Sequence, residues 1–265
     1  MLDQMILGRY VPIDSYIHRL DPRMKIVFVF IMMIVIFMAN SITTYGILLV
    51  MILVILYLSN LKLSFLIGGL KPILLLLAFT FLMHVFLTKG GQNLFSYGII
   101  DIDSNGIIQG LFISMRFVLI IFLTTIMTLT TSPISLTDAI ESLLNPLKKL
   151  KVPVHEFALM MSIALRFIPT LMDELTKVMR AQMSRGSDMT SGSFMSRLKA
   201  ITPLLVPLFV SAFKRAEDLA IAMEVRGYRG DIGRTKYRKL DWQARDTWAL
   251  ITVIPITLAI LYFRT

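Results

Sequence analysis

Two tripeptides, Ser184-Arg185-Gly186 and Val225-Arg226-Gly227, each place an arginine directly before a glycine. Glycine accepts the left-handed backbone that ends a helix, so each tripeptide predicts a helix C-terminus with a cation in its last turn. Such an arginine could simply face the negative end of its own helix dipole. It could instead bind a partner, because a guanidinium donates charge-assisted hydrogen bonds of about 1.5–3 kcal/mol each. One motif per helix favours two equivalent binding elements for two equivalent partner sites.

Little else in the sequence could carry out a reaction. The chain has no cysteine, which excludes a disulfide framework, a zinc–thiolate site and an iron–sulfur cluster. His18, His84 and His155 are scattered, and His155-Glu156 does not begin a His-Glu-x-x-His motif because Leu159 holds the final position. Without a Gly-x-x-x-x-Gly-Lys-Ser/Thr loop, we expect no ATP hydrolysis, cofactor or metal site in this chain. A serine-based enzymatic site stays open.

The elements that position the tripeptides belong to a membrane protein. Hydrophobic residues make up 56% of the 265 residues and charged residues only 17%, whereas soluble domains carry about 25% charged residues. The fold class expected is therefore an all-α membrane protein. Apolar runs that fit a hydrocarbon layer of about 30 Å predict five transmembrane helices, at 24–39, 43–59, 71–88, 107–131 and 247–263.

Lysine and arginine in the loops predict the orientation. The segment before the first span and the 60–71 loop are basic, whereas the 40–45 turn is uncharged and the 89–106 loop is not basic overall. The positive-inside rule then places the N-terminus and the 132–246 region in the cytoplasm and the C-terminus outside the cell membrane. This topology also accounts for the net charge of +10 without a nucleic-acid partner.

The 132–246 region is unusual because it is both apolar and charged. It holds 18 of the 27 basic and 12 of the 17 acidic residues. Apolar residues repeat in steps of four and three, which predicts long amphipathic helices at 154–183 and 197–224. A shorter helix at 135–149, with Ser135 as a candidate N-cap, precedes them. We expect three domains: 1–131 with four spans, 132–246 as a cytoplasmic coupling domain, and 247–265 as the final span.

The two long helices, joined by the short turn 187–193, must pack against each other or against the membrane domain. If they cross or run antiparallel, their C-terminal ends lie about one helix length apart, on the order of 45 Å. Arg185 and Arg226 then cannot enter one pocket of one soluble protein. A dimeric partner with one groove per subunit would accommodate both.

Several motifs together carry a resemblance to a known family. Besides the two Arg-Gly tripeptides, they are Ile17-His18-Arg19-Leu20-Asp21-Pro22-Arg23, Leu165-Arg166-Phe167-Ile168-Pro169 and Ala222-Met223-Glu224. In this order they resemble the transmembrane T component of energy-coupling factor (ECF) importers of vitamins and metals. The resemblance covers the whole chain. The family often has alanine before the Arg-Gly pair, where this chain has Ser184 and Val225.

The resemblance implies a non-catalytic scaffold of an ABC-type importer. Its coupling helices would insert the Ser184–Gly186 and Val225–Gly227 motifs into grooves of two ATPase subunits, the A and A′ components, which bind ATP and Mg. Their apolar face would bind a small substrate-binding membrane protein, the S component, for vitamin or micronutrient uptake. The alternative is an ordinary ABC permease that forms its own substrate pathway. No predicted span contains Asp or Glu, which argues against a proton- or sodium-coupled transporter.

Other residues have two interpretations each. Arg116 in the fourth span could be functional, as intramembrane cations often are, or could pair with a polar group of a neighbouring span. The basic run 234–239, followed by Trp242, suits anionic headgroups. Five methionines could give an adaptable surface for different S components or could fill a core; they are Met160, Met161, Met172, Met179 and Met183.

Overall fold

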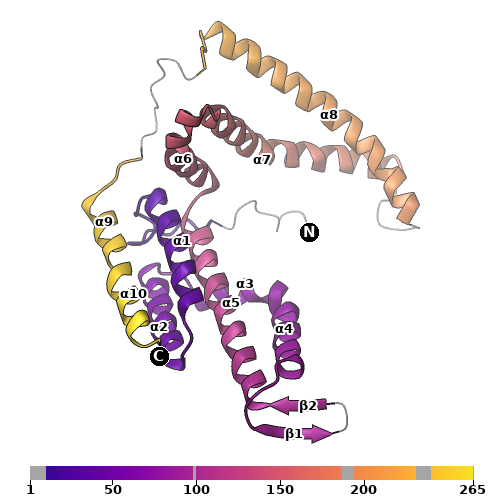
Figure 1. Ribbon diagram of the computed structural model, residues 1–265. Helices are drawn as coiled ribbons and strands as arrows, with labels where there is room; N and C mark the ends of the chain where they lie inside the picture. The colour runs from indigo at the N-terminus through magenta and orange to yellow at the C-terminus, as the bar shows by residue number, and fades with distance from the viewer. Residues whose placement is uncertain (1–9, 98–99, 187–193, 231–239, 265) are drawn as a thin grey trace. The chain divides into compact units, whose positions relative to one another are not determined.

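The computed structural model describes residues 10–97, 100–186, 194–230 and 240–264 (Figure 1). The chain divides into two compact units. The first, here the membrane unit, comprises residues 1–139 and 240–265. The second, here the α7–α8 unit, comprises residues 140–239. The 187–193 turn and the basic run 234–239 lie outside the described residues.

The membrane unit is built almost entirely of helices, and a 3-10 turn, Lys71–Ile73, joins its third helix to its fourth. The helices are α1 (Pro22–Met38), α2 (Ile42–Leu58), α3 (Leu63–Leu70), α4 (Leu74–Leu87), α5 (Ser104–Thr130), α9 (Ala244–Ile251) and α10 (Val253–Tyr262). Helix α1 begins with Asp21 as N-cap and Pro22 in its first turn, the position that proline favours.

The core of the membrane unit lies where α1, α2, α5 and α10 meet. Lipid tails are as apolar as leucine, so close packing rather than the hydrophobic effect holds such helices together. Fully buried side chains come from all four helices and include Met32, Ile36, Leu48, Ile52, Leu119 and Ile260. These side chains fix the helices against one another.

Two glycines one helical turn apart allow α4 and α5 to approach closely. A Cβ at Gly106 would lie 2.8 Å from the backbone oxygen of His84, and one at Gly110 would lie 3.1 Å from the ring of Phe81. A Gly-x-x-x-Gly pair of this kind is typical of tightly packed membrane helices. The α4–α5 hairpin therefore depends on the absence of side chains at Gly106 and Gly110.

Three details differ from the sequence prediction. The 89–106 loop contains an antiparallel hairpin of β1 (Asn93–Tyr97) and β2 (Ile100–Asp103). Helical structure begins at Leu63, earlier than the predicted span at 71, and continues through Lys71–Ile73. The final span is interrupted at Thr252, because the ring of Pro255 conflicts with a regular turn around the carbonyl of residue 251.

Helix α6 (Pro133–Leu144) crosses the boundary between the two units. In the α7–α8 unit it is followed by a 3-10 helix, Asn145–Leu150. The prediction of Ser135 as N-cap was wrong. Ser132 accepts the backbone N–H of Ser135 and Pro133 opens the helix, which suits the fixed φ of proline. The two long helices are α7 (Val154–Ser184) and α8 (Phe194–Val225), so their predicted existence is confirmed.

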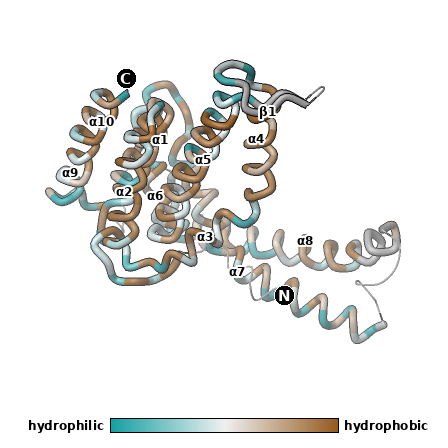
Figure 2. Tube along the Cα trace, turned by 90° about the horizontal axis from the view of Figure 1, so that it is seen from below, coloured by the Kyte–Doolittle hydropathy of each residue, from teal (hydrophilic) through white to brown (hydrophobic). Residues whose placement is uncertain are grey.

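The predicted fold class is confirmed. Within the described residues, four helical segments are long and apolar enough to cross a membrane, and α2 is a shorter apolar helix. The four segments are Leu63–Leu87, Ser104–Thr130, Val154–Ser184 and Ala244–Tyr262. The third is α7, whose mean hydropathy is the lowest of the four. Figure 2 shows hydrophobic colour over most of α1, α2 and α4, whereas α7 and α8 alternate between hydrophobic and hydrophilic residues.

Candidate functional site

Both Arg-Gly pairs end a helix in the predicted way. Gly186 has φ +84° and Gly227 has φ +72°, the left-handed conformation that favours glycine. The N–H of Gly227 donates to the carbonyl of Glu224 (2.8 Å), and that of Tyr228 donates to the carbonyl of Met223 (3.0 Å). These are the two bonds of a Schellman motif. After the helix Val154–Ser184, the N–H of Gly186 donates to the carbonyl of Met183 (3.0 Å).

The arginine side chains are left available by these caps. Backbone N–H groups already satisfy the terminal carbonyls, so the guanidinium groups are not needed to end the helices. Arg185 and Arg226 are both exposed. Neither guanidinium has a hydrogen-bond or ion-pair partner among the residues that the structure describes. Each helix therefore presents a solvated cation at its end.

Helices α7 and α8 pack side by side and run in opposite directions (Figure 1). Arg215 Nη2 of α8 lies 3.0 Å from Glu174 Oε2 of α7. A cavity of about 320 Å3 between the helices is lined by Ile163, Phe167 and Leu171 of α7 and by residues of α8 up to Met223. Residues before Glu174 thus lie beside residues after Arg215, which is the antiparallel arrangement.

The ion pair lies midway between the two arginine motifs. Arg185 follows Glu174 along α7 by the same number of positions as Arg226 follows Arg215 along α8, and the two helices run in opposite directions. At a rise of about 1.5 Å per residue, each arginine is about 16 Å along the axis from the ion pair, and the two are about 33 Å apart. The structure therefore separates the arginines too far for one small pocket.

The long helices also carry exposed apolar side chains. On α8, a stripe in steps of one helical turn includes Leu205, Val206, Phe209, Val210 and Phe213, here the α8 stripe; each is at least 46% exposed. Four of the five methionines singled out in the sequence are also exposed, namely Met160, Met161, Met172 and Met183. Monomeric soluble proteins seldom leave such apolar surface uncovered. The exposure favours an adaptable surface over core filling for these methionines.

The Leu-Asp-Pro-Arg motif ties three segments together inside the membrane unit. Asp21 caps α1, accepting from the N–H of Arg23, and its carboxylate lies 2.7 Å from Arg23 Nη2. The same nitrogen of Arg23 donates to the carbonyl of Leu240 (2.9 Å). Asp246 accepts the N–H groups of Asp21 and Gln243, both at 2.8 Å. Sequence reasoning missed these contacts, because the partners lie near opposite ends of the chain.

Arg116 has the structural role that the sequence allowed. Its Nη2 donates to the carbonyl of Ala39 (3.1 Å), and its guanidinium carbon lies 5.4 Å from the centre of the Phe37 ring. Ala39 ends α1, so Arg116 binds a carbonyl that the helix leaves free. This contact favours the pairing interpretation over a transport role.

The three histidines occupy separate environments. His84 Nδ1 lies 2.8 Å from the carbonyl of Thr80 in its own helix, and His155 Nδ1 lies 3.0 Å from Glu141 Oε1. His18 Nδ1 lies 2.7 Å from Ser15 Oγ, and its Nε2 lies 3.0 Å from the carbonyl of Val11. Burial lowers the pKa of His18. No group of three or more potential metal ligands occurs within the described ranges.

These features define a multi-pass helical membrane protein with two arginine-ended amphipathic helices. Residues 14–237 match the family described as cobalt transport protein. The chain is 72% identical, over the full length of both chains, to the energy-coupling factor transporter transmembrane protein EcfT of Macrococcus caseolyticus. It is 55% identical to EcfT of Bacillus subtilis over the full length of both. It is 54% identical to EcfT of Staphylococcus aureus, covering 100% of this chain and 98% of the relative.

The chain therefore belongs to the family of energy-coupling factor transporter transmembrane proteins. It is a multi-pass transmembrane component of such a transporter. The family was predictable from the motifs quoted above, and that prediction is confirmed.

Proposed function

We propose that this chain is the non-catalytic coupling scaffold of an ECF-type importer. In this role it transmits the ATP-driven movement of two ATPase subunits to a substrate-binding S component, for uptake of a vitamin or another micronutrient. ATP and Mg are bound by the ATPases. The N-terminus and the α7–α8 unit lie in the cytoplasm, and the C-terminus lies outside.

The observation that carries the proposal is the pair of exposed arginines at opposite ends of α7 and α8, both unpartnered among the described residues. Arginine is enriched at interface hot spots, and its planar fork suits carboxylates or free helix carbonyls. An axial separation of about 33 Å requires two docking grooves, as in two ATPase subunits. Ser184–Gly186 enters one groove and Val225–Gly227 the other.

The S component is proposed to bind the apolar face of α7 and α8. The α8 stripe and the exposed methionines of α7 provide that face. Methionine adapts to partners of different shape because it is unbranched and polarizable. Phe213→Asp, at a side chain 74% exposed, should release the S component while both ATPases stay bound.

Copurification from the native membrane tests the coupling role. The tagged chain, extracted in mild detergent, should bring down two ABC ATPase subunits and one small hydrophobic membrane protein. Arg185→Glu and Arg226→Glu should each remove ATPase from the complex and abolish uptake. Arg180→Glu and Lys214→Glu are matched controls, since both residues are exposed on the same helices, and they should keep the complex intact.

Two results would contradict the proposal. One is normal assembly and uptake with both Arg185→Glu and Arg226→Glu. The other is a chain that emerges alone or as a homo-oligomer, even with ATP analogues present, which would favour an ordinary permease. Because the guanidinium groups make no hydrogen bonds or ion pairs with the described residues, loss of the complex would not reflect misfolding, and an unchanged unfolding midpoint would verify this.

A further inference from the structure

The apolar contact between α7 and α8 repeats with every helical turn. The cavity between the two helices is lined on both sides by rows of residues that are spaced by four positions. The rows are Ile163, Phe167 and Leu171 on α7, and Ala212, Ala216 and Ala220 on α8. Rows of this spacing form the ridges of the commonest class of helix contact. If one helix slipped along the other by one turn, about 5.4 Å, apolar side chains in the cavity would exchange places with other apolar side chains.

The packing between these helices is also too open to fix their register, that is, which residues of α7 lie opposite which residues of α8. The cavity has a volume of about 320 Å3, whereas well-packed protein interiors have few voids larger than a water molecule. Among the described residues of α7 and α8, the buried ones are Val154, His155 and Leu204, and none of these three lines the cavity. The apolar contact therefore holds the helices together but does little to select one alignment.

A polar cluster at the edge of the cavity does depend on the alignment. Arg215 Nη2 of α8 lies 3.0 Å from Glu174 Oε2 of α7. Ser211, one turn earlier on α8, also makes a hydrogen bond to Glu174, and its Oγ accepts from Arg215 Nε at 3.4 Å. A slip of about 5.4 Å would carry the carboxylate beyond the 4 Å reach of a salt bridge and would also separate it from the serine. The observed register is therefore the one in which this cluster forms.

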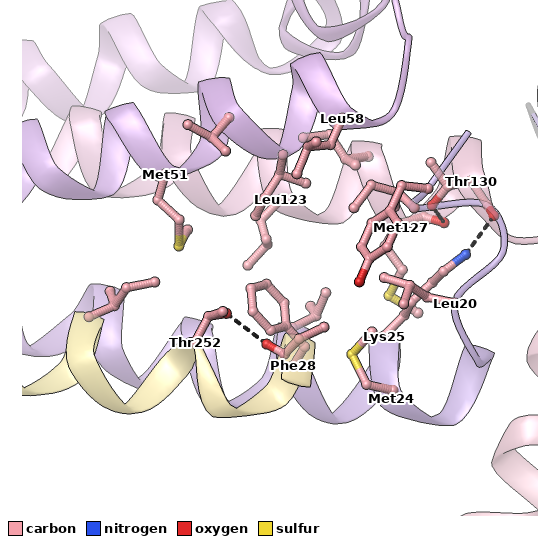
Figure 3. A pocket seen from close by; sticks show the side chains of 18 of the residues that line it. Leu20, Met24, Lys25, Phe28, Met51, Leu58, Leu123, Met127, Thr130 and Thr252 are labelled. Atoms are coloured by element: carbon pink, nitrogen blue, oxygen red, sulfur yellow. Dashed lines mark hydrogen bonds between the residues drawn. The ribbon is translucent and has the colours of Figure 1, made fainter. Parts of the chain in front are cut away.

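The helices of the membrane unit are fixed against one another at more points. Lys25 of α1 donates to the carbonyl of Thr130 of α5 at 2.9 Å, as Figure 3 shows. Near the other end of α1, Arg116 of α5 donates to the carbonyl of Ala39 at 3.1 Å. Fully buried side chains of both helices belong to the core of this unit. In the α7–α8 contact, by comparison, the structure describes an open cavity and the cluster at Glu174.

We propose that the Glu174–Arg215 pair fixes the register of α7 against α8 and thereby sets the distance between Arg185 and Arg226. A polar contact within an otherwise apolar helix contact is well attested as a means of specifying register. In the observed register the two arginines are about 33 Å apart along the axis, and a slip of one turn would change this distance to about 27 or 39 Å. Glu174 and Arg215 are thus positioning residues for the two motifs. That ATPases use this distance, unlike the register itself, rests on the function proposed above.

Distances between spin labels measure the register in the free chain. The chain has no cysteine, so Ala181→Cys and Ala222→Cys, at exposed positions ahead of the two motifs, would each accept one label. In the observed register these positions are about 21 Å apart along the axis. The full-length chain in nanodiscs, studied by double electron–electron resonance, should give one narrow distance distribution. Glu174→Gln should broaden it and populate distances displaced by about one turn, 5.4 Å.

Moving the carboxylate along α7 should move the register with it. In the double variant Glu174→Gln/Thr170→Glu, Arg215 finds a carboxylate one turn earlier on α7, so the distance between the labels should increase by about 5–6 Å. Asp173→Asn and Lys214→Gln are matched controls, since each removes an exposed charge adjacent to the pair, and they should leave the distance unchanged. Circular dichroism should show the same helix content in all variants.

Copurification of the ATPases shows whether the distance between the motifs matters for assembly. The double variant should retain about half of the ATPase bound by the parent chain, because the two motifs no longer reach both grooves at once. The Asp173→Asn and Lys214→Gln controls should retain all of it.

The proposal fails if Glu174→Gln gives the same distance distribution as the parent chain, or if the double variant shows no increase in distance. It also fails if the distance increases and both ATPases still bind as in the parent, since the spacing would then not position the motifs. Normal ATPase binding by both Arg185→Glu and Arg226→Glu would instead contradict the proposed function. The spin-label distances are measured without ATPases, so they decide the register in either case.

Discussion

The membrane unit and the α7–α8 unit treat their polar and apolar groups in opposite ways. In the membrane unit, Arg23, Lys25 and Arg116 all bind protein oxygen atoms, and core side chains such as Met32 are fully buried. In the α7–α8 unit, Arg185 and Arg226 are exposed and the α8 stripe is open. In the first region these cations bind the protein itself, whereas in the second the two terminal arginines and the α8 stripe are exposed. Substitutions should therefore affect folding in the first region and assembly in the second.

The largest difference in stability should be between removing a buried charge and removing an exposed one. Asp246→Ala removes a carboxylate that is 1% exposed and leaves two N–H groups without an acceptor. It should lower the free energy of unfolding by about 3 kcal/mol. Arg226→Ala should change it by less than about 0.5 kcal/mol. Denaturant unfolding of the purified chain, followed by circular dichroism, would measure both; similar losses would contradict the comparison.

Apolar truncations should differ in the same direction. Leu48→Ala, at a fully buried site, should cost about 2 kcal/mol, at the low end of the usual range because lipid tails are as apolar as leucine. Phe213→Ala, on the α8 stripe, should be neutral in the free chain. The midpoint of thermal unfolding should fall by roughly 4–8 °C for the first variant and stay constant for the second.

Replacing glycines should also lower stability by different amounts in the two units, because the glycines have different structural roles there. Gly106→Ala would place a Cβ 2.8 Å from the carbonyl oxygen of His84, and should destabilise the α4–α5 packing by about 1–3 kcal/mol. At Gly186 a Cβ meets nothing within 4 Å, so Gly186→Ala should cost only the left-handed backbone, about 1 kcal/mol. Unfolding midpoints of the two variants would rank them, and the reverse order would refute this account.

The smallest effect should be the contribution of His18, in the membrane unit, to the pH dependence of stability. Because burial lowers the pKa of His18, the unfolded chain binds a proton more readily than the folded chain. The free energy of unfolding should be highest above the ordinary histidine pKa of about 6.5 and should decrease as the pH falls below it. The unfolding midpoint between about pH 7.5 and 5.5 should decline less in His18→Gln; an identical slope would exclude His18 as the cause.

The sequence predicted the helices that local signals define. Long uncharged runs set α1 and α2, and glycine after arginine set the ends of α7 and α8, because a left-handed residue acts on its own helix alone. The sequence did not predict the contacts between residues that are far apart in the chain. Arg23 contacts Leu240 and Glu174 contacts Arg215 only in the folded protein, although the partners are far apart in the chain. The break at Thr252 was also missed, because the apolar run at 247–263 was interpreted as one continuous span in spite of Pro255.

The midpoint position of the Glu174–Arg215 pair has a consequence in terms of symmetry. A twofold axis that exchanged Arg185 with Arg226 would have to pass through that ion pair, because the two arginines are equally far from it along their helices. Yet the axis would exchange a carboxylate with a guanidinium, so the symmetry of this helix pair is only approximate. A partner made of two identical halves would meet different charges on its two sides.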